Sequence, residues 1–181
     1  YYVATSIPYV IAEPHIGFAM ELLYADVLAR RARQLGNEVI FSTGSDEHGG
    51  KIAEKAAEKK MEPKAFTDEV SKKFQDLTQL LNVSNNRFIR TTDPGHEQRA
   101  KLIWKSLEKD IYKDKYHGWY CTGDEAFFSE KEVKANKGIC PNHNRPYEEV
   151  EEENYFFKLS NYTDAINKAV VTGQYFIIPE T

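Results

Sequence analysis

Two short apolar runs flank one long helical pattern in the first 45 residues, and this order constrains the fold more than any other feature. Residues 1–7 and 38–42 have the apolar character of strands. Strand, helix and strand in this order form a βαβ unit whose strands pair in parallel, so an α/β fold is expected. Helical spacing predicts these inward positions for the helix: Ile16, Ala19, Met20, Leu23, Val27, Leu28, Ala32 and Leu35.

Polar loops follow both predicted strands. Pro14 to Phe18 lead into the helix, and residues 43–50 form a glycine-rich loop with Asp46 after the second strand. Ligands of a parallel sheet collect beyond the carboxyl ends of its strands, so we expect His15 and Asp46 on one rim. Backbone N–H groups at a helix start bind phosphate, and we therefore interpret the first loop as half of an ATP site.

The residue types in these loops allow specific chemistry, although each also has an ordinary structural explanation. A histidine at a helix start can donate to phosphate oxygens as charge develops, and Gly17 lets a nucleotide approach the backbone. Asp46 can bind an ammonium group. Alternatively, His15 is a structural residue near a helix cap and Asp46 belongs to a solvated turn.

The remaining pattern predicts further helices and one more strand. Residues 51–60 form a helix with a solvated face, and a second helix carries Phe66, Val70, Phe74, Leu77 and Leu81. Residues 87–90 form a short strand. Thr92-Asp93-Pro94 is a helix start, and that helix runs to about Asp110 with Ile103 and Leu107 inward. Helix returns at 160–172, with this apolar face: Tyr162, Ala165, Ile166, Ala169 and Val170.

Between these helices, residues 113–157 change in texture to short segments with alternating aromatic residues, which indicates a small β-rich insertion. Cys121-x-x-Asp124 and Cys140-x-x-His143 have the spacing of a structural zinc site. A loop without metal, or two buried free thiols, fits the same spacing. The acidic run 148–153 is either a solvated face or a docking segment.

Composition limits the class of protein. A net charge of −4 argues against a surface that binds nucleic acid throughout. No apolar run approaches the roughly 20 residues of a membrane span, and the first residues do not have the basic run followed by an apolar run that is typical of a secretory signal. Two cysteines are too few for a disulfide scaffold, so we expect a reducing cytoplasm. The first residue already lies in a strand pattern, which suggests a fragment of a longer protein.

Several separated motifs, in order, resemble the methionyl-tRNA synthetases, a family of class I aminoacyl-tRNA synthetases. They are Ile7-Pro8-Tyr9, Pro14-His15-Ile16-Gly17, Ala25-Asp26-Val27-Leu28-Ala29-Arg30, Thr43-Gly44-Ser45-Asp46-Glu47-His48-Gly49, Gly118-Trp119-Tyr120-Cys121, Cys140-Pro141-Asn142-His143 and Glu153-Asn154-Tyr155-Phe156-Phe157. The resemblance covers essentially all 181 residues. It implies activation of methionine by ATP, accompanied by magnesium, and transfer of methionine to tRNA(Met). The oligomeric state is left open.

The resemblance also implies site residues and domains. His15, Gly17 and Phe18 match the ATP signature, with His15 and Gly17 as its catalytic members. Ile7, Tyr9 and Asp46 match the methionine pocket, and the ligands of a zinc knuckle would be Cys121, Asp124, Cys140 and His143. Residues 1–112 would be the first half of a Rossmann-type catalytic domain, 113–157 a connective insertion, and 158–181 a return toward the second half.

Three departures from the family pattern define the alternatives. Phe18 replaces the usual last histidine of the ATP signature, Asp124 replaces a frequent cysteine, and no Lys-Met-Ser-Lys-Ser-like loop occurs. We therefore expect these 181 residues alone to be inactive. The alternatives are a degenerate synthetase half that acts as a binding or partner module, and another nucleotidyl transferase with a related signature.

Overall fold

A computed structural model describes residues 1–124 and 126–178 of the chain. The chain divides into two compact units, Tyr1–Lys101 and Leu102–Thr181. The domain boundaries expected at 112 and 157 stay a prediction, because this division into compact units does not define an insertion.

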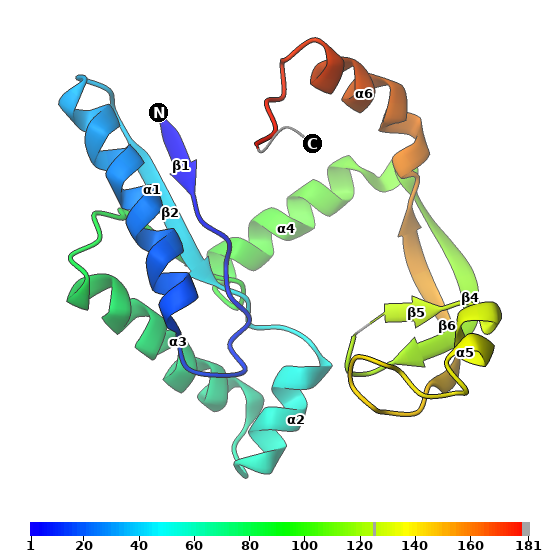
Figure 1. Cartoon of the computed structure of the whole chain (residues 1–181). Coiled ribbons are helices and arrows are strands. Elements are labelled where there is room, and N and C mark those ends of the chain that lie inside the picture. Colours follow the sequence, from blue (N-terminus) through cyan, green and yellow to red (C-terminus); the bar gives the residue numbers. More distant parts are fainter. Residues whose placement is uncertain (125, 179–181) are drawn as a thin grey trace. The chain divides into compact units, whose positions relative to one another are not determined.

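The first unit contains a three-stranded parallel sheet, as the βαβ pattern predicts (Figure 1). Its strands are β1 (Tyr2–Ala4), β2 (Ile40–Ser45) and β3 (Arg87–Arg90), in the order β1-β2-β3. The strand expected within residues 1–7 forms, but β1 has only three residues, and Tyr2 is 66% exposed at the sheet edge rather than buried. The strand β2 runs farther than expected because its pairing with β3 continues to Ser45, opposite Arg90.

The helix α1 (Ile16–Gln34) forms where the periodicity placed it, but it buries a different face. Of the expected inward residues only Ala19 and Ala32 are buried, and Ile16 is 87% exposed. Small residues face the sheet instead: Ala25, Ala29 and Ala32 cluster with Val39 and Phe41. Apolar residues of α1 occur on more than one side of the helix, so their spacing in the sequence does not indicate which side is buried.

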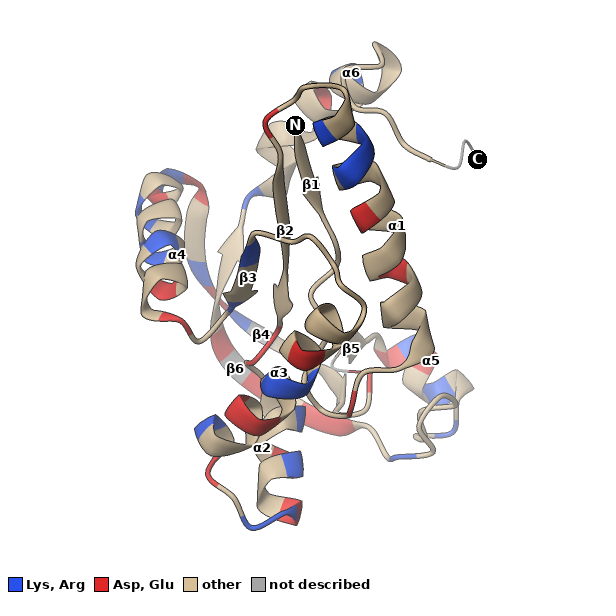
Figure 2. Ribbon diagram, turned by 90° about the vertical axis from the view of Figure 1, so that its left-hand side faces the viewer, with Lys and Arg blue, Asp and Glu red and all other residues tan. Residues whose placement is uncertain are grey.

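Two further helices complete the core of the first unit. They are α2 (Gly50–Glu58) and α3 (Pro63–Leu80), and both match the predicted positions. Charges of both signs cover the outer side of α2, as expected for a solvated helix (Figure 2). The main apolar cluster joins α1, α2 and α3 and consists of Val10, Phe18, Leu22, Ile52, Ala56, Phe66, Val70 and Phe74.

The helix α4 (Pro94–Ser106) begins at the predicted proline but ends earlier than expected, and a 3-10 turn occupies Glu108–Asp110. The inward assignment of Ile103 was wrong, because its side chain is 60% exposed. The last helix, α6 (Thr163–Val171), follows a 3-10 turn at Leu159–Tyr162 and buries Ala169 alone. None of the helices in the described part of the chain has the length and apolar character that crossing a membrane requires.

The second unit is built on an antiparallel sheet with the order β5-β4-β6. The strands β4 (Ile111–Cys121) and β6 (Glu148–Phe157) are much longer than the short segments expected there, and β5 (Ala126–Phe128) and α5 (Glu130–Ala135) lie between them. The acidic run lies on β6, where Lys113 pairs with Glu153, Lys115 with Glu151 and His117 with Glu149. Cross-strand ion pairs of this kind stabilise the sheet modestly.

Candidate functional site

The loop after β1 lies beside the end of β2 (Figure 1). The Asp46 amide donates to the Pro8 carbonyl at 2.9 Å, and the Val10 amide donates to the Asp46 carbonyl at 3.1 Å. These bonds form an isolated parallel bridge between Tyr9 and Asp46. The polar loop of β2 and the loop that leads to α1 are therefore joined through their backbones.

Two glycines show how closely side chains approach this loop. A Cβ on Gly44 would lie 2.1 Å from the Ile89 carbonyl oxygen and 3.1 Å from Cγ2 of Ile7. A Cβ on Gly49, where φ is +127°, would lie 1.8 Å from the Tyr9 hydroxyl. Only glycine suits these positions. The structure thus brings Ile7, Tyr9 and Asp46 to one end of the sheet.

His15 is the N-cap of α1, and its side chain is held by the helix that it caps. Nδ1 of His15 accepts a hydrogen bond from the Gly17 amide at 3.1 Å. The proton of a neutral ring therefore lies on Nε2, which can donate to a ligand. A Cβ on Gly17 would come within 2.9 Å of the imidazole ring, so Gly17 leaves room for that ring. His15 and Asp46 lie in loops at the same end of the sheet, and their action on one ligand stays a prediction.

The Phe18 side chain belongs to the core. It is 5% exposed and contacts Phe74 edge to face, with 5.2 Å between the ring centroids. Aromatic pairs in this geometry contribute beyond the area they bury. The ring faces away from solvent and the Phe18 amide donates to the His15 carbonyl at 3.1 Å, so the expected ATP contact of Phe18 stays a prediction.

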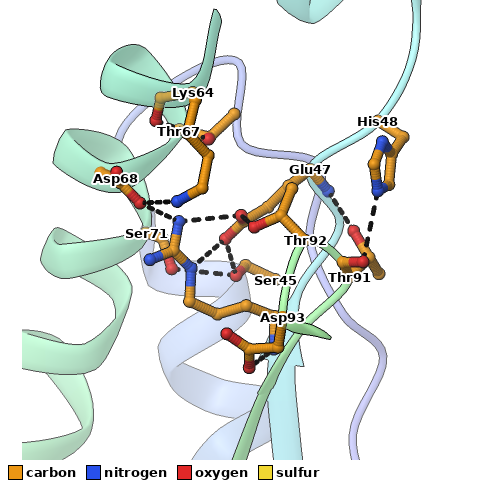
Figure 3. Close-up of polar contacts among 11 residues, drawn as sticks. Ser45, Glu47, His48, Lys64, Thr67, Asp68, Ser71, Thr91, Thr92 and Asp93 are labelled. Atoms are coloured by element: carbon orange, nitrogen blue, oxygen red, sulfur yellow. Dashed lines mark hydrogen bonds and ion pairs between the residues drawn. The ribbon is translucent and has the colours of Figure 1, made fainter. Parts of the chain in front are cut away.

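A buried polar network surrounds Glu47, the residue that follows Asp46 in the sequence (Figure 3). The Glu47 side chain is fully buried, and its carboxylate accepts two hydrogen bonds from Arg90, at 2.7 and 2.8 Å. Thr92 and Ser45 donate to the same carboxylate at 2.5 and 2.7 Å. Burial alone would raise the pKa of Glu47, but these hydrogen bonds and the charge of Arg90 outweigh burial and lower it. Glu47 is therefore held as a carboxylate.

A family model described as tRNA synthetases class I (M) matches residues 1–151. The chain belongs to this family. Among solved structures, the synthetase chain is similar to "Mycobacterium tuberculosis methionyl-tRNA synthetase in complex with methionyl-adenylate", at 41% identity and a TM-score of 0.89. That match covers 99% of this chain and 36% of the other. The expected α/β class with a parallel sheet is thereby confirmed.

Curated relatives of the chain are also methionine–tRNA ligases. The synthetase chain is 42% identical to a methionine–tRNA ligase of Clostridium tetani, with a match over 100% of this chain and 28% of the relative. It is 41% identical to a methionine–tRNA ligase of Thermotoga maritima, over 99% of this chain and 29% of the relative. The chain thus spans less than a third of the length of these two ligases.

In the second unit of the synthetase chain, the four expected metal ligands come together. The ligand atoms of Cys121, Asp124, Cys140 and His143 all lie within 4.8 Å of one another. The Cys140 thiol donates to Asp124 at 2.8 Å, and Nδ1 of His143 lies 3.2 Å from the other Asp124 oxygen. Hydrogen bonds from Cys140 and Asn142 lower the pKa of Asp124 to about 2. The sequence spacing predicted this cluster, although residues 121 and 140 are far apart along the chain.

The sequence interpretation missed Glu47 and Arg90. Their side chains meet across 43 positions, from the end of β2 to the end of β3. One signal was present in the sequence. Glu47 comes just after one predicted strand and Arg90 is the last residue of another, and parallel pairing brings these two strand ends together. The expectation of a polar glycine-rich loop at 43–50 did not include burial, whereas Thr43, Ser45 and Glu47 are buried.

Proposed function

We propose that the intact protein activates methionine with ATP to form methionyl-adenylate and then transfers the methionyl group to tRNA(Met). One observation carries the proposal. Ile7, Tyr9 and Asp46 lie at one end of a parallel sheet, in a chain that is 41% identical to a synthetase solved with methionyl-adenylate. Because translation consumes the product, we place the protein in the cytoplasm.

Each site residue has a role in this proposal. The Asp46 carboxylate binds the ammonium group of methionine, and the side chains of Ile7 and Tyr9 line the pocket. Nε2 of His15 binds phosphate oxygens of ATP, whose charge magnesium shields. The methionine carboxylate attacks the α-phosphorus, a P–O bond forms, and the bond to pyrophosphate breaks. Gly17 supports the step by leaving space for the His15 ring.

The test is methionine-dependent exchange of pyrophosphate into ATP by the full-length protein. We expect exchange with methionine and none with the other amino acids. Exchange with a different amino acid, and none with methionine, would contradict the assignment. Absence of both exchange and methionine binding would favour a non-catalytic partner module, the alternative that the departures from the family pattern at Phe18 and Asp124 motivate. The 181 residues alone are expected to show no exchange, since they contain no Lys-Met-Ser-Lys-Ser-like loop.

We further propose that residues 113–157 are a connective insertion that holds zinc, and that 158–181 lead toward the rest of the catalytic domain. Two thiolates, an imidazole and a carboxylate are a donor set that zinc accepts. Their ligand atoms are also close enough together for one ion. A bound zinc would join the loop after β4 to the loop after α5 and stabilise the fold of this segment. Elemental analysis of the purified protein should give one zinc per chain.

Gly123→Ala is expected to reduce zinc occupancy while leaving all four ligands in the sequence. A Cβ on Gly123 would lie 2.4 Å from Cγ of His143 and must displace that ring. Misplacing one ligand lowers affinity for zinc by about tenfold or more. The measurement is competition for zinc with a chromophoric chelator. Gly138→Ala is the control, because space around Gly138 is open, although its φ of +78° adds some backbone strain. Equal zinc affinity in the Gly123→Ala variant and the wild type would remove His143 from the ligand set.

A further inference from the structure

The two residues on either side of Asp46 point into the protein. Ser45 Oγ donates to Glu47 at 2.7 Å and lies 2.9 Å from Ser71 Oγ, and both Ser45 and Glu47 are buried. Figure 3 shows them together beside the helix that carries Ser71 and Asp68. Asp46 lies between these two residues and is half-buried. Side chains alternate along an extended strand, so Asp46 is directed to the opposite side.

We propose that Glu47, held by Arg90 and Thr92, is a positioning residue that fixes the Asp46 carboxylate for the ammonium group of the amino-acid substrate. This inference rests on the function proposed above and adds residues to it. Glu47 does not contact the substrate. It acts by fixing the backbone of its neighbour.

The backbone around Asp46 is restrained from two directions. On one side, Asp46 exchanges hydrogen bonds with Pro8 and Val10 of the loop after β1. On the other side, the Glu47 amide donates to Oγ1 of Thr91 at 2.9 Å, just beyond β3. The Glu47 side chain adds four further hydrogen bonds, from Arg90, Thr92 and Ser45. Arg90 in turn contacts Asp68 on α3, so the restraint reaches three elements.

The Asp46 side chain itself lacks such restraint. Among the residues that the structure describes, no hydrogen bond or ion pair to its carboxylate is found, whereas Glu47 has four. Its position therefore follows from the backbone on each side. A binding group without protein partners is available to a ligand, and it recognises that ligand well only if its geometry is preset.

Stability alone is a weak reason for a buried ion pair at this place. Removing a carboxylate and a guanidinium from water is costly, and apolar residues of similar volume often stabilise a fold as well or better. A fork of hydrogen bonds from Arg90 fixes direction as well as distance. The hydrogen bonds between Arg90 and Glu47 are therefore suited to fixing an orientation. The neighbouring Asp46 carboxylate is a group that must be oriented to bind its ligand.

The experiment measures the KM for methionine, the KM for ATP and kcat in pyrophosphate exchange by the full-length protein. Glu47→Gln keeps the shape and removes the charge. Thr92→Val removes one hydrogen bond to Glu47 and spares the ion pair, so it tests the same restraint if Glu47→Gln fails to fold. Glu58→Gln is the matched control, because Glu58 makes an exposed ion pair with Lys55 on α2.

We expect Glu47→Gln to raise the KM for methionine about tenfold or more, with the KM for ATP within about twofold of wild type. Thr92→Val should raise the KM for methionine about threefold, and Glu58→Gln should change neither constant. A merely structural role predicts that both KM values stay unchanged, or shift together with a lower melting temperature, and either result overturns the inference. Wild-type protein without methionine-dependent exchange would overturn the proposed function itself. A wild type with exchange, whose variants keep the methionine KM, would overturn the positioning role alone.

Discussion

Asp46→Asn is expected to raise the KM for methionine in pyrophosphate exchange about 100-fold, within a range of roughly 30-fold to 1,000-fold. The substitution removes the negative charge that Asp46 offers to the ammonium group in the proposed pocket. It leaves the backbone bonds to Pro8 and Val10 intact, because they use the amide and carbonyl of residue 46. The fold of the loop should therefore persist, and the loss should fall on methionine binding.

The control for this prediction is Asp76→Asn, the same chemical change at an exposed ion pair with Lys72 on α3. It should leave the KM for methionine within about twofold, since exposed pairs contribute little. The KM for ATP should stay near the wild-type value in both variants. A methionine KM that does not move in Asp46→Asn would mean that Asp46 is a turn residue, and the methionine pocket would have to be sought elsewhere.

The order of elements in the first unit could be predicted from the sequence because each element depends on local information. Helical spacing, a proline at a helix start and short apolar runs located α1, α2, α3 and β3 within a few residues. The loops that hold His15 and Asp46 directly follow predicted strands. Parallel pairing then brings those loops to one end of the sheet.

Other features depend on contacts between residues that are distant in sequence. The buried face of α1 is set by small alanines that let the helix approach β2, whereas Met20 and Leu23 remain exposed. Spacing alone cannot distinguish these faces, since both are apolar. Likewise, nothing local marks Glu47 as buried, because its partner Arg90 belongs to another strand. A lone charged residue in a glycine-rich loop is more often solvated.

The cluster of Cys121, Asp124, Cys140 and His143 is an intermediate case. Its spacing in the sequence is a recognised pattern, and the structure brings its four ligand atoms together. The length of the strands β4 and β6 on which this segment is built was not expected, because glycines such as Gly118, which lies within β4, indicate short segments. Their pairing satisfies the acidic side chains through Lys113, Lys115 and His117.

The sequence and the structure assign different roles to Phe18. From sequence, it is a defect in an ATP signature, and Phe18→His would repair it. In the structure, the ring is packed against Phe74 within the main apolar cluster of the first unit. An imidazole there would lose that contact and bury polar nitrogens in a cluster of apolar side chains. We expect Phe18→His to lower the free energy of opening around α1 by about 2–4 kcal/mol.

Hydrogen exchange of α1 peptides, followed by mass spectrometry in the full-length protein, measures this loss where it occurs. Both tryptophans, Trp104 and Trp119, lie in the second unit, so their fluorescence does not report on α1. Phe18→Leu is the matched control and should cost less than about 1.5 kcal/mol, because leucine keeps the site apolar. If Phe18→His instead left α1 exchange unchanged and increased the rate of pyrophosphate exchange, residue 18 would face the nucleotide. A core role for Phe18 predicts faster hydrogen exchange of α1 in the Phe18→His variant and no increase in the rate of pyrophosphate exchange.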